Sequence, residues 1–181
     1  MPEGLLLESC RTLGLLILLQ MLLIDVRLVT SLPFCDKSVL DHFIKSITEQ
    51  QKAMNAPCLF SENITLPQPS LNAEWTRLQT SQQEAEIHRG FQLFLDSVPK
   101  VTTFVSRCKL EVSLQRFSSN IRTMTNILKR VTQKTETQNL EYEERTLSIS
   151  TLQQFYTVYK NFLIGKYKTV IISLCKDLQR R

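Results

Sequence analysis

The chain of 181 residues has little of what metal centres and catalytic sites are made from. It has only two histidines, His42 and His88, and no two cysteines form a CxxC pair, so no metal site is predicted. Glu84 and His88 stand four residues apart, the spacing of a surface pair on one helix rather than of an acid–base site. No nucleophile accompanies a base and an oxyanion device, so the sequence predicts no enzyme, no catalytic residue and no cofactor.

Long hydrophobic runs are equally scarce, and the one at Leu13–Ile24 is followed by small residues from Thr30 onward. It is shorter than the roughly 20 residues that a membrane-spanning helix needs, but it suits the apolar segment of a secretory signal peptide. We therefore expect residues 1–31 to be removed and residues 32–181 to form one secreted, extracellular domain without membrane insertion. A buried core helix interrupted by Gln20 is the alternative.

Acidic residues are fewer than basic ones, which gives a net charge of +5. Removing residues 1–31 takes away two basic and three acidic residues and raises the net charge to +6. The basic residues are dispersed, and their short clusters at Lys129–Arg130 and Arg180–Arg181 carry no interleaved aromatic residues. Nucleic-acid binding is therefore not expected, whereas a basic surface could steer the protein toward an acidic receptor.

The cysteines support secretion, because loss of the signal peptide leaves an even set of Cys35, Cys58, Cys108 and Cys175. Two disulfides are expected, and their number and spacing alone leave three connectivities open.

Apolar residues recur at helical spacing in four segments. The predicted helices cover about 36–54, Ser70 to Val105, 111–132, and Ser150 to Cys175. Ser70 is a candidate N-cap, Ser150 and Gln153 have the spacing of a capping box, and Pro99 is expected to kink or shorten its helix. Residues 133–149 are polar and predict a long loop.

The connections between these helices are long, short and long, which predicts an up-up-down-down order. The predicted fold is all-α, a long-chain four-helix bundle with two long crossover loops. In this topology the first helix begins and the last helix ends at one pole, so we expect a Cys35–Cys175 disulfide there. Cys58 and Cys108 lie near the opposite pole and form the second expected pair.

Four segments, CDKSVLDHFI, SENITLPQPSLNAEW, SQQEAE and VYKNFLIGKYK, resemble the erythropoietin/thrombopoietin family of helical cytokines in order and spacing. The resemblance implies a monomeric hormone that joins two copies of a single-span receptor of the erythropoietin-receptor type. It also implies signals for erythroid proliferation, differentiation and survival through receptor-associated kinases. A thrombopoietin-like or other long-chain cytokine is the alternative, followed by a lipid-binding secreted helical protein and then a secreted enzyme.

The resemblance also implies two unequal receptor-binding faces. The stronger face corresponds to Ser70, Leu71, Asn72, Asn161, Phe162, Gly165 and Lys166, and the weaker face to Val39, His42, Phe43, Ser119, Arg122, Thr123 and Ile127. By helical spacing, however, Phe162 is expected in the core.

Several positions depart from the family pattern. Ile164 and Ser70 stand where the family usually has Arg and Lys, and His42 and Phe43 stand where it has Arg and Tyr, so charge is lost from both faces. Asn63 begins the chain's single Asn-x-Ser/Thr sequon and is expected to carry a glycan.

Overall fold

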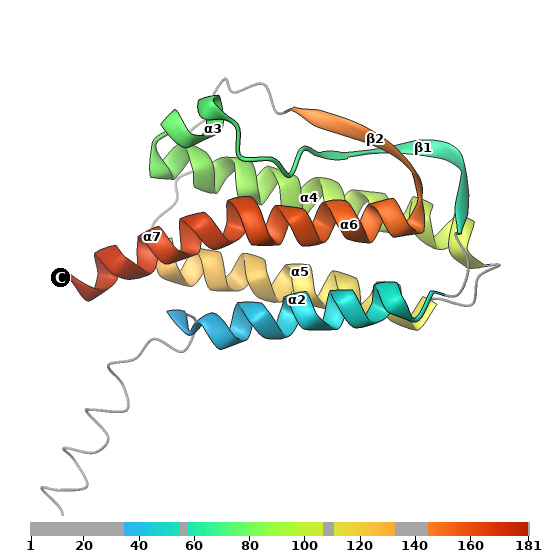
Figure 1. The fold of residues 1–181 in the computed structure, drawn as a ribbon, viewed down its shortest axis with the longest axis horizontal. Helices are drawn as coiled ribbons and strands as arrows, with labels where there is room; N and C mark the ends of the chain where they lie inside the picture. Colours follow the sequence, from blue (N-terminus) through green and yellow to red (C-terminus); the bar gives the residue numbers. More distant parts are fainter. Residues whose placement is uncertain (1–34, 55–57, 107–110, 133–144, 181) are drawn as a thin grey trace, which may run out of the picture. The chain divides into compact units, whose positions relative to one another are not determined.

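The computed structural model describes residues 35–54, 58–106, 111–132 and 145–180. Residues 37–181 form one compact unit of helices with two short strands (Figure 1). The helices are α2 (Lys37–Lys52), α3 (Ala73–Arg77), α4 (Thr80–Val105), α5 (Glu111–Thr132), α6 (Leu152–Phe162), the π-helical turn η3 (Leu163–Tyr167) and α7 (Lys168–Gln179). The strands are β1 (Leu59–Pro67) and β2 (Thr146–Thr151).

The long helices confirm the predicted up-up-down-down four-helix bundle. In Figure 1, α2 and α4 run from left to right, whereas α5 and the continuous α6–η3–α7 helix run back from right to left. Helix α4 packs against α5, α2 against α6, and α5 against α7. The predicted third helix, 111–132, has the bounds of α5.

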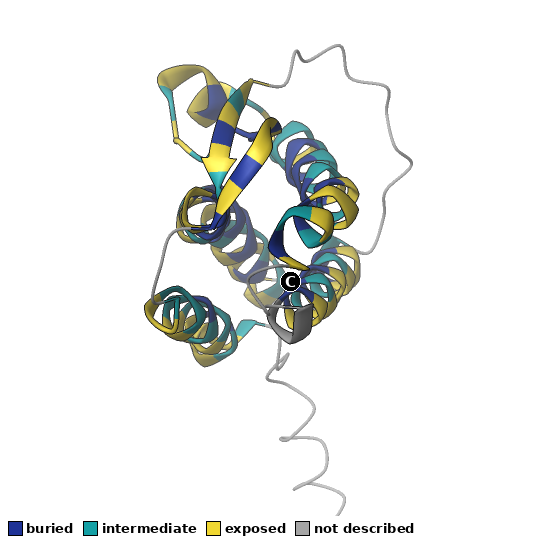
Figure 2. Cartoon of the chain, turned by 90° about the vertical axis from the view of Figure 1, so that its right-hand side faces the viewer, coloured by how far each residue is buried: buried dark blue, intermediate teal, exposed yellow. Residues whose placement is uncertain are grey.

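Aromatic residues from three helices form the centre of the core. Phe94, Phe117 and Tyr159 are almost completely buried, with ring centroids 4.5 Å apart for Phe117–Tyr159 and 5.1 Å apart for Phe94–Tyr159. Edge-to-face pairs of this kind add to the stability that burial of the rings provides. Figure 2 shows that buried residues gather on the helix faces that are turned toward one another.

The two crossovers contain a small antiparallel sheet that the sequence analysis did not predict. Ile64 of β1 faces Ile149 of β2, and Leu66 faces Leu147. Ile64, Leu66 and Ile149 are buried, and β1 packs on α4, so the pairing covers one side of the bundle with alternating apolar residues. The predicted loop at 133–149 was therefore wrong for residues 146–149, while residues 133–144 lie outside the described part of the chain.

The predicted second helix is two helices. Asn72 rather than Ser70 is the N-cap of α3, and its Oδ1 accepts a hydrogen bond of 2.7 Å from the Trp75 amide. Helix α4 starts only after Gln79, whose own amide donates to Gln82 Oε1 at 2.9 Å. Pro99 does not shorten the helix, because α4 continues to Val105.

The last helix begins one residue later than predicted. Thr151 is its N-cap and accepts a hydrogen bond of 3.1 Å from the Gln154 amide. The Gln154 side chain in turn accepts from the Ser150 amide at 2.9 Å. The expected pairing of Ser150 with Gln153 was therefore wrong, because the Thr–Gln pair next to it satisfies the backbone donors instead.

The predicted disulfide between Cys35 and Cys175 is confirmed. Cys58 is also disulfide-bonded, but its predicted partner Cys108 lies outside the described residues, so that pairing stays a prediction. The predicted signal peptide, residues 1–31, lies outside them as well. Among the helices that the structure describes, none is long and apolar enough to cross a membrane.

Candidate functional site

The last helix changes to a π-helical turn at Leu163–Tyr167, in the segment that the family resemblance marks as functional. Buried residues in this helix repeat every four positions, as Phe162, Lys166 and Val170 show. Four residues overshoot one α-helical turn by about 40°, so a strict repeat of four would rotate out of the core. The wider π turn takes up the extra residue and keeps the buried stripe facing inward.

This geometry takes two residues of the predicted stronger face into the interior. Lys166 is 3% exposed, and its Nζ donates a hydrogen bond to Oε1 of Glu86 on α4, which is 2% exposed. Phe162 is fully buried and packs on Phe91 and Phe94, with ring centroids 5.6 Å apart in both cases. Lys166 and Phe162 are therefore not part of the accessible surface in this structure.

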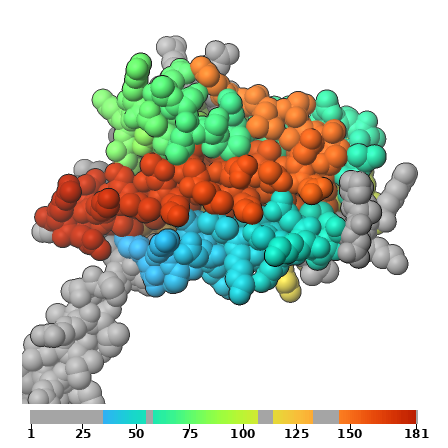
Figure 3. All heavy atoms as spheres, viewed as in Figure 1, coloured from blue at the N-terminus to red at the C-terminus, as the bar shows by residue number. Residues whose placement is uncertain are grey.

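Gly165 lies where the end of the first crossover meets the last helix. A Cβ built on Gly165 would lie 3.1 Å from the Pro69 carbonyl oxygen and 3.7 Å from Leu71 Cγ, so the absence of a side chain permits this close approach. In Figure 3 the green crossover end and the red-orange last helix adjoin on one face. The structure thus brings together the two segments that the resemblance assigned to the stronger face.

We call the accessible residues here the π-turn face, which consists of Ser70, Leu71, Asn161, Ile164 and Gly165. Leu71 is 45% exposed and Ile164 is 41% exposed, which is high for large apolar side chains. No residue of the π-turn face is charged. Ile164 stands where the family usually has Arg, and its exposure next to Gly165 makes it a further candidate contact.

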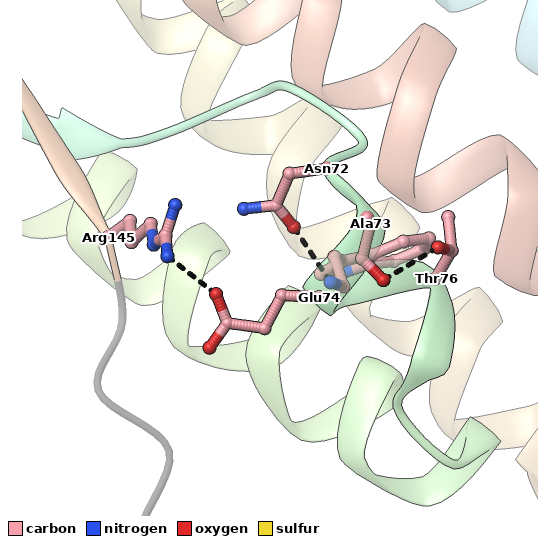
Figure 4. Close-up of polar contacts among 6 residues, drawn as sticks. Asn72, Ala73, Glu74, Thr76 and Arg145 are labelled. Carbon is pink, nitrogen blue, oxygen red and sulfur yellow. Dashed lines mark hydrogen bonds and ion pairs between the residues drawn. The ribbon is translucent and has the colours of Figure 1, made fainter.

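Polar contacts hold the crossover end in place (Figure 4). Asn72, also predicted for the stronger face, is half-buried and uses its side chain to cap α3. Arg145, which precedes β2 in the second crossover, forms an exposed ion pair of 2.6 Å with Glu74 of α3. Both crossovers therefore meet at α3, next to the π-turn face.

The residues of the predicted weaker face lie on two helices, α2 and α5. Ser119 and Arg122 are exposed on α5 and line a groove that also includes Val98 and Thr102 of α4. The other α5 residues are the exposed Thr123 and the half-buried Ile127, and the α2 residues are the exposed His42 and the half-buried Val39 and Phe43. The residues that line this groove come from α4 and α5.

Several ionisable groups away from these surfaces have pKa values that burial shifts. Burial lowers the pKa of His88, and the nearby Lys129 lowers it further, while burial raises the pKa of Glu84. Burial likewise raises the pKa of Tyr159 and of Tyr167, which keeps both phenols neutral. Among the residues placed by the structure, no group of three His, Cys, Asp or Glu could hold a metal ion.

The predicted glycosylation residue, Asn63, is exposed on β1. Its neighbour Ile64 points into the core, so the alternation of the strand turns the Asn63 side chain away from the bundle.

A bundle of long helices in up-up-down-down order, joined by two long crossovers, is the architecture of the long-chain helical cytokines. The erythropoietin/thrombopoietin family matches residues 32–178, and the chain belongs to this family. Members of the family are hormones, so the chain is an erythropoietin-like cytokine and not an enzyme.

Individual relatives agree with this assignment. The chain is 27% identical to erythropoietin of Felis catus, with 93% of this chain and 97% of the relative covered. It is 27% identical to erythropoietin of Canis lupus familiaris, over 90% of this chain and 88% of the relative. Erythropoietin of the fish Epinephelus coioides is 29% identical, over 88% of this chain and 91% of the relative.

Proposed function

We propose that the chain is a secreted erythropoietin-like hormone that binds and dimerises a single-span cytokine receptor. Two receptor copies per monomeric ligand bring their associated kinases together and promote erythroid proliferation, differentiation and survival. The observation that carries this proposal is the π-turn face, where the first crossover and the last helix meet at Gly165 with Leu71 and Ile164 exposed. Large apolar side chains that stay exposed close to one another commonly mark a protein-interaction site.

The second, weaker contact is proposed for the residues around Arg122. Arg122 is exposed beside the groove between α4 and α5, and a guanidinium there can pair with an acidic receptor residue. Arg122 does not belong to the π-turn face, so a separate substitution can test each of the two contacts.

A thrombopoietin-like specificity is the alternative within the same class. A lipid-binding function is supported less well, because the large aromatic residues Phe94, Phe117 and Tyr159 are packed inside the bundle instead of facing outward.

The proposal is tested by mixing the secreted chain with the same-species erythropoietin-receptor ectodomain and measuring the mass of the complex. We expect one ligand with two receptors. Gly165→Ala should weaken the first binding step about tenfold, which is about 1.4 kcal/mol, because the added methyl group displaces Pro69. Arg122→Ala should leave the first step intact and reduce the complex with two receptors.

Two controls distinguish binding effects from loss of fold. Both variants should keep the far-ultraviolet helicity of the natural chain, and Lys100→Ala, at an exposed lysine of α4 outside both surfaces, should bind normally. Binding to a thrombopoietin receptor, with none to the erythropoietin receptor, would select the alternative instead.

A further inference from the structure

The Lys166–Glu86 pair places two opposite charges inside the mostly apolar core of the bundle. Lys166 Nζ donates to Glu86 Oε1 and lies 6.0 Å from the centroid of the Phe162 ring. The second carboxylate oxygen, Glu86 Oε2, is buried and accepts no hydrogen bond from the residues that the structure describes. The charges are therefore incompletely solvated where they lie.

Stability alone is a poor reason to keep such a pair. Both ions lose their hydration on burial, and well-packed apolar residues of similar size often stabilise a core at least as well. A directional contact provides something that apolar packing does not, because it specifies one rotation of one helix against another.

The position of the pair shows which rotation it specifies. Gly165 packs against the Pro69 carbonyl of the crossover, Lys166 bonds to Glu86 of α4, and the Tyr167 hydroxyl donates to the Met124 carbonyl of α5 at 3.3 Å. Three consecutive residues of the π turn thus face three different partners. Lys166 is the one among them that contacts α4 through a charged hydrogen bond.

We propose that Glu86 and Lys166 are positioning residues that hold the π turn in its register and thereby present Asn161 and Ile164 beside Leu71. Without the ion pair the turn can relax to a regular α-helix, since a π turn is rare and is not favoured by itself. Such a relaxation rotates the exposed side chains away from the crossover end. This inference rests on the proposed function, because it assigns the pair a role in receptor affinity.

The decisive variant replaces both charges by apolar residues, Glu86→Leu with Lys166→Met, in the full secreted chain. We expect a free energy of unfolding in urea no lower than that of the natural chain, but receptor binding at least tenfold weaker in the first step. Amide hydrogen exchange at residues 163–167 should change as well. The reversed pair, Glu86→Lys with Lys166→Glu, keeps a directional contact and should bind more tightly than the apolar variant.

A control pair tests whether the removal of two charges by itself weakens receptor binding. Lys45 and Glu49 are exposed on α2 at 4.0 Å, and replacing both by alanine should leave the first binding step unchanged. An apolar variant that is folded and binds the receptor like the natural chain would overturn the inference, as would unchanged amide exchange in the π turn.

The binding and exchange measurements also separate two other results. If the natural chain does not bind the receptor, the proposed function fails, while the exchange measurement still tests whether the pair holds the π turn. If the apolar variant does not fold, Glu86→Gln replaces it, because glutamine keeps an acceptor for Lys166. Normal exchange at 163–167 in a folded Glu86→Gln variant would support the directional contact, and exchange like that of a regular helix would count against it.

Discussion

Gly90 is a position where α4 closely approaches the last helix. A Cβ at this position would lie 2.6 Å from Cζ of Phe162, whose ring is fixed between other buried aromatic rings. We expect Gly90→Ala to lower the free energy of unfolding by about 1–3 kcal/mol, as overpacked cores usually do. Urea denaturation measures this, and Gly165→Ala is the matched control, because its Cβ would meet Pro69 less closely, at 3.1 Å. Equal losses in the two variants would contradict the prediction.

His88 should make stability depend on pH. Burial lowers its pKa below the ordinary value of 6.5, and the nearby Lys129 lowers it further. The unfolded chain therefore takes up a proton before the folded chain does, so the contribution of His88 is complete above pH 6.5 and is lost as the pH falls below it. Between pH 7.5 and 5, the free energy of unfolding in urea should fall less for His88→Gln than for the natural chain.

The pH experiment needs a histidine control. His42→Gln removes an exposed imidazole on α2. If both variants changed the pH dependence of urea denaturation equally, burial of His88 would not be its cause.

Single residues were predicted unevenly, and Lys166 shows why. Its family match suggested a surface contact, whereas the spacing of four from Phe162 and Val170 indicates the core. The spacing is the more direct physical signal, but a lysine in a buried stripe needs a partner, and Glu86 is 80 residues away in the sequence. The burial of Lys166 could be read from the sequence, but its ion pair could not.

At the scale of the element, the start of the last helix provides a test. Thr151 accepts a hydrogen bond from the Gln154 amide, so Thr151→Ala should cost about 1 kcal/mol of stability. Ser150→Ala should cost much less, because Ser150 contacts Gln154 mainly through its backbone amide, which alanine keeps. Thermal unfolding of both variants compares the two positions. A larger loss of stability for Ser150→Ala would indicate that Ser150 caps the helix, as expected from the sequence.

The strands and the break before α4 illustrate what local patterns miss. Thr146–Thr151 is too short and polar to predict a strand by itself, and it becomes one because β1 offers a partner from the other crossover. At the break before α4, Leu78 and Gln79 have extended backbone, and Gln79 and Gln82 form a capping box that apolar spacing does not indicate. Long helices with regular apolar spacing, such as α5, were predictable to the residue.

At the scale of the whole molecule, the Cys35–Cys175 disulfide should contribute the largest single stabilisation. It closes a loop of 140 residues, for which the chain-entropy relation gives about 5 kcal/mol. Cys35→Ala with Cys175→Ala should therefore lower the urea midpoint strongly while helicity in buffer is retained. A midpoint within error of the natural chain would show that the unfolded chain is already compact without the bridge.

The topology was predictable because connection lengths restrict the order of long helices. A short link around Cys108 allows only antiparallel neighbours, and the long links allow parallel ones. The proposed receptor-binding surfaces were less predictable, since neighbours in a family motif, such as the half-buried Gly165 and the buried Lys166, differ in exposure. The packed structure is needed to tell which of these two residues is accessible and which is buried.

The two-stranded sheet has a consequence for handling the protein. In the described part of the chain β1 pairs only with β2, so its outer backbone edge is open, and Leu59 on that strand is 70% exposed. Open edges invite strands of other molecules and lead to aggregation. Asn63 lies on the same strand with its side chain outward, so a carbohydrate attached there would shield the edge during concentration and storage. Protein produced without carbohydrate should therefore precipitate first, through β1.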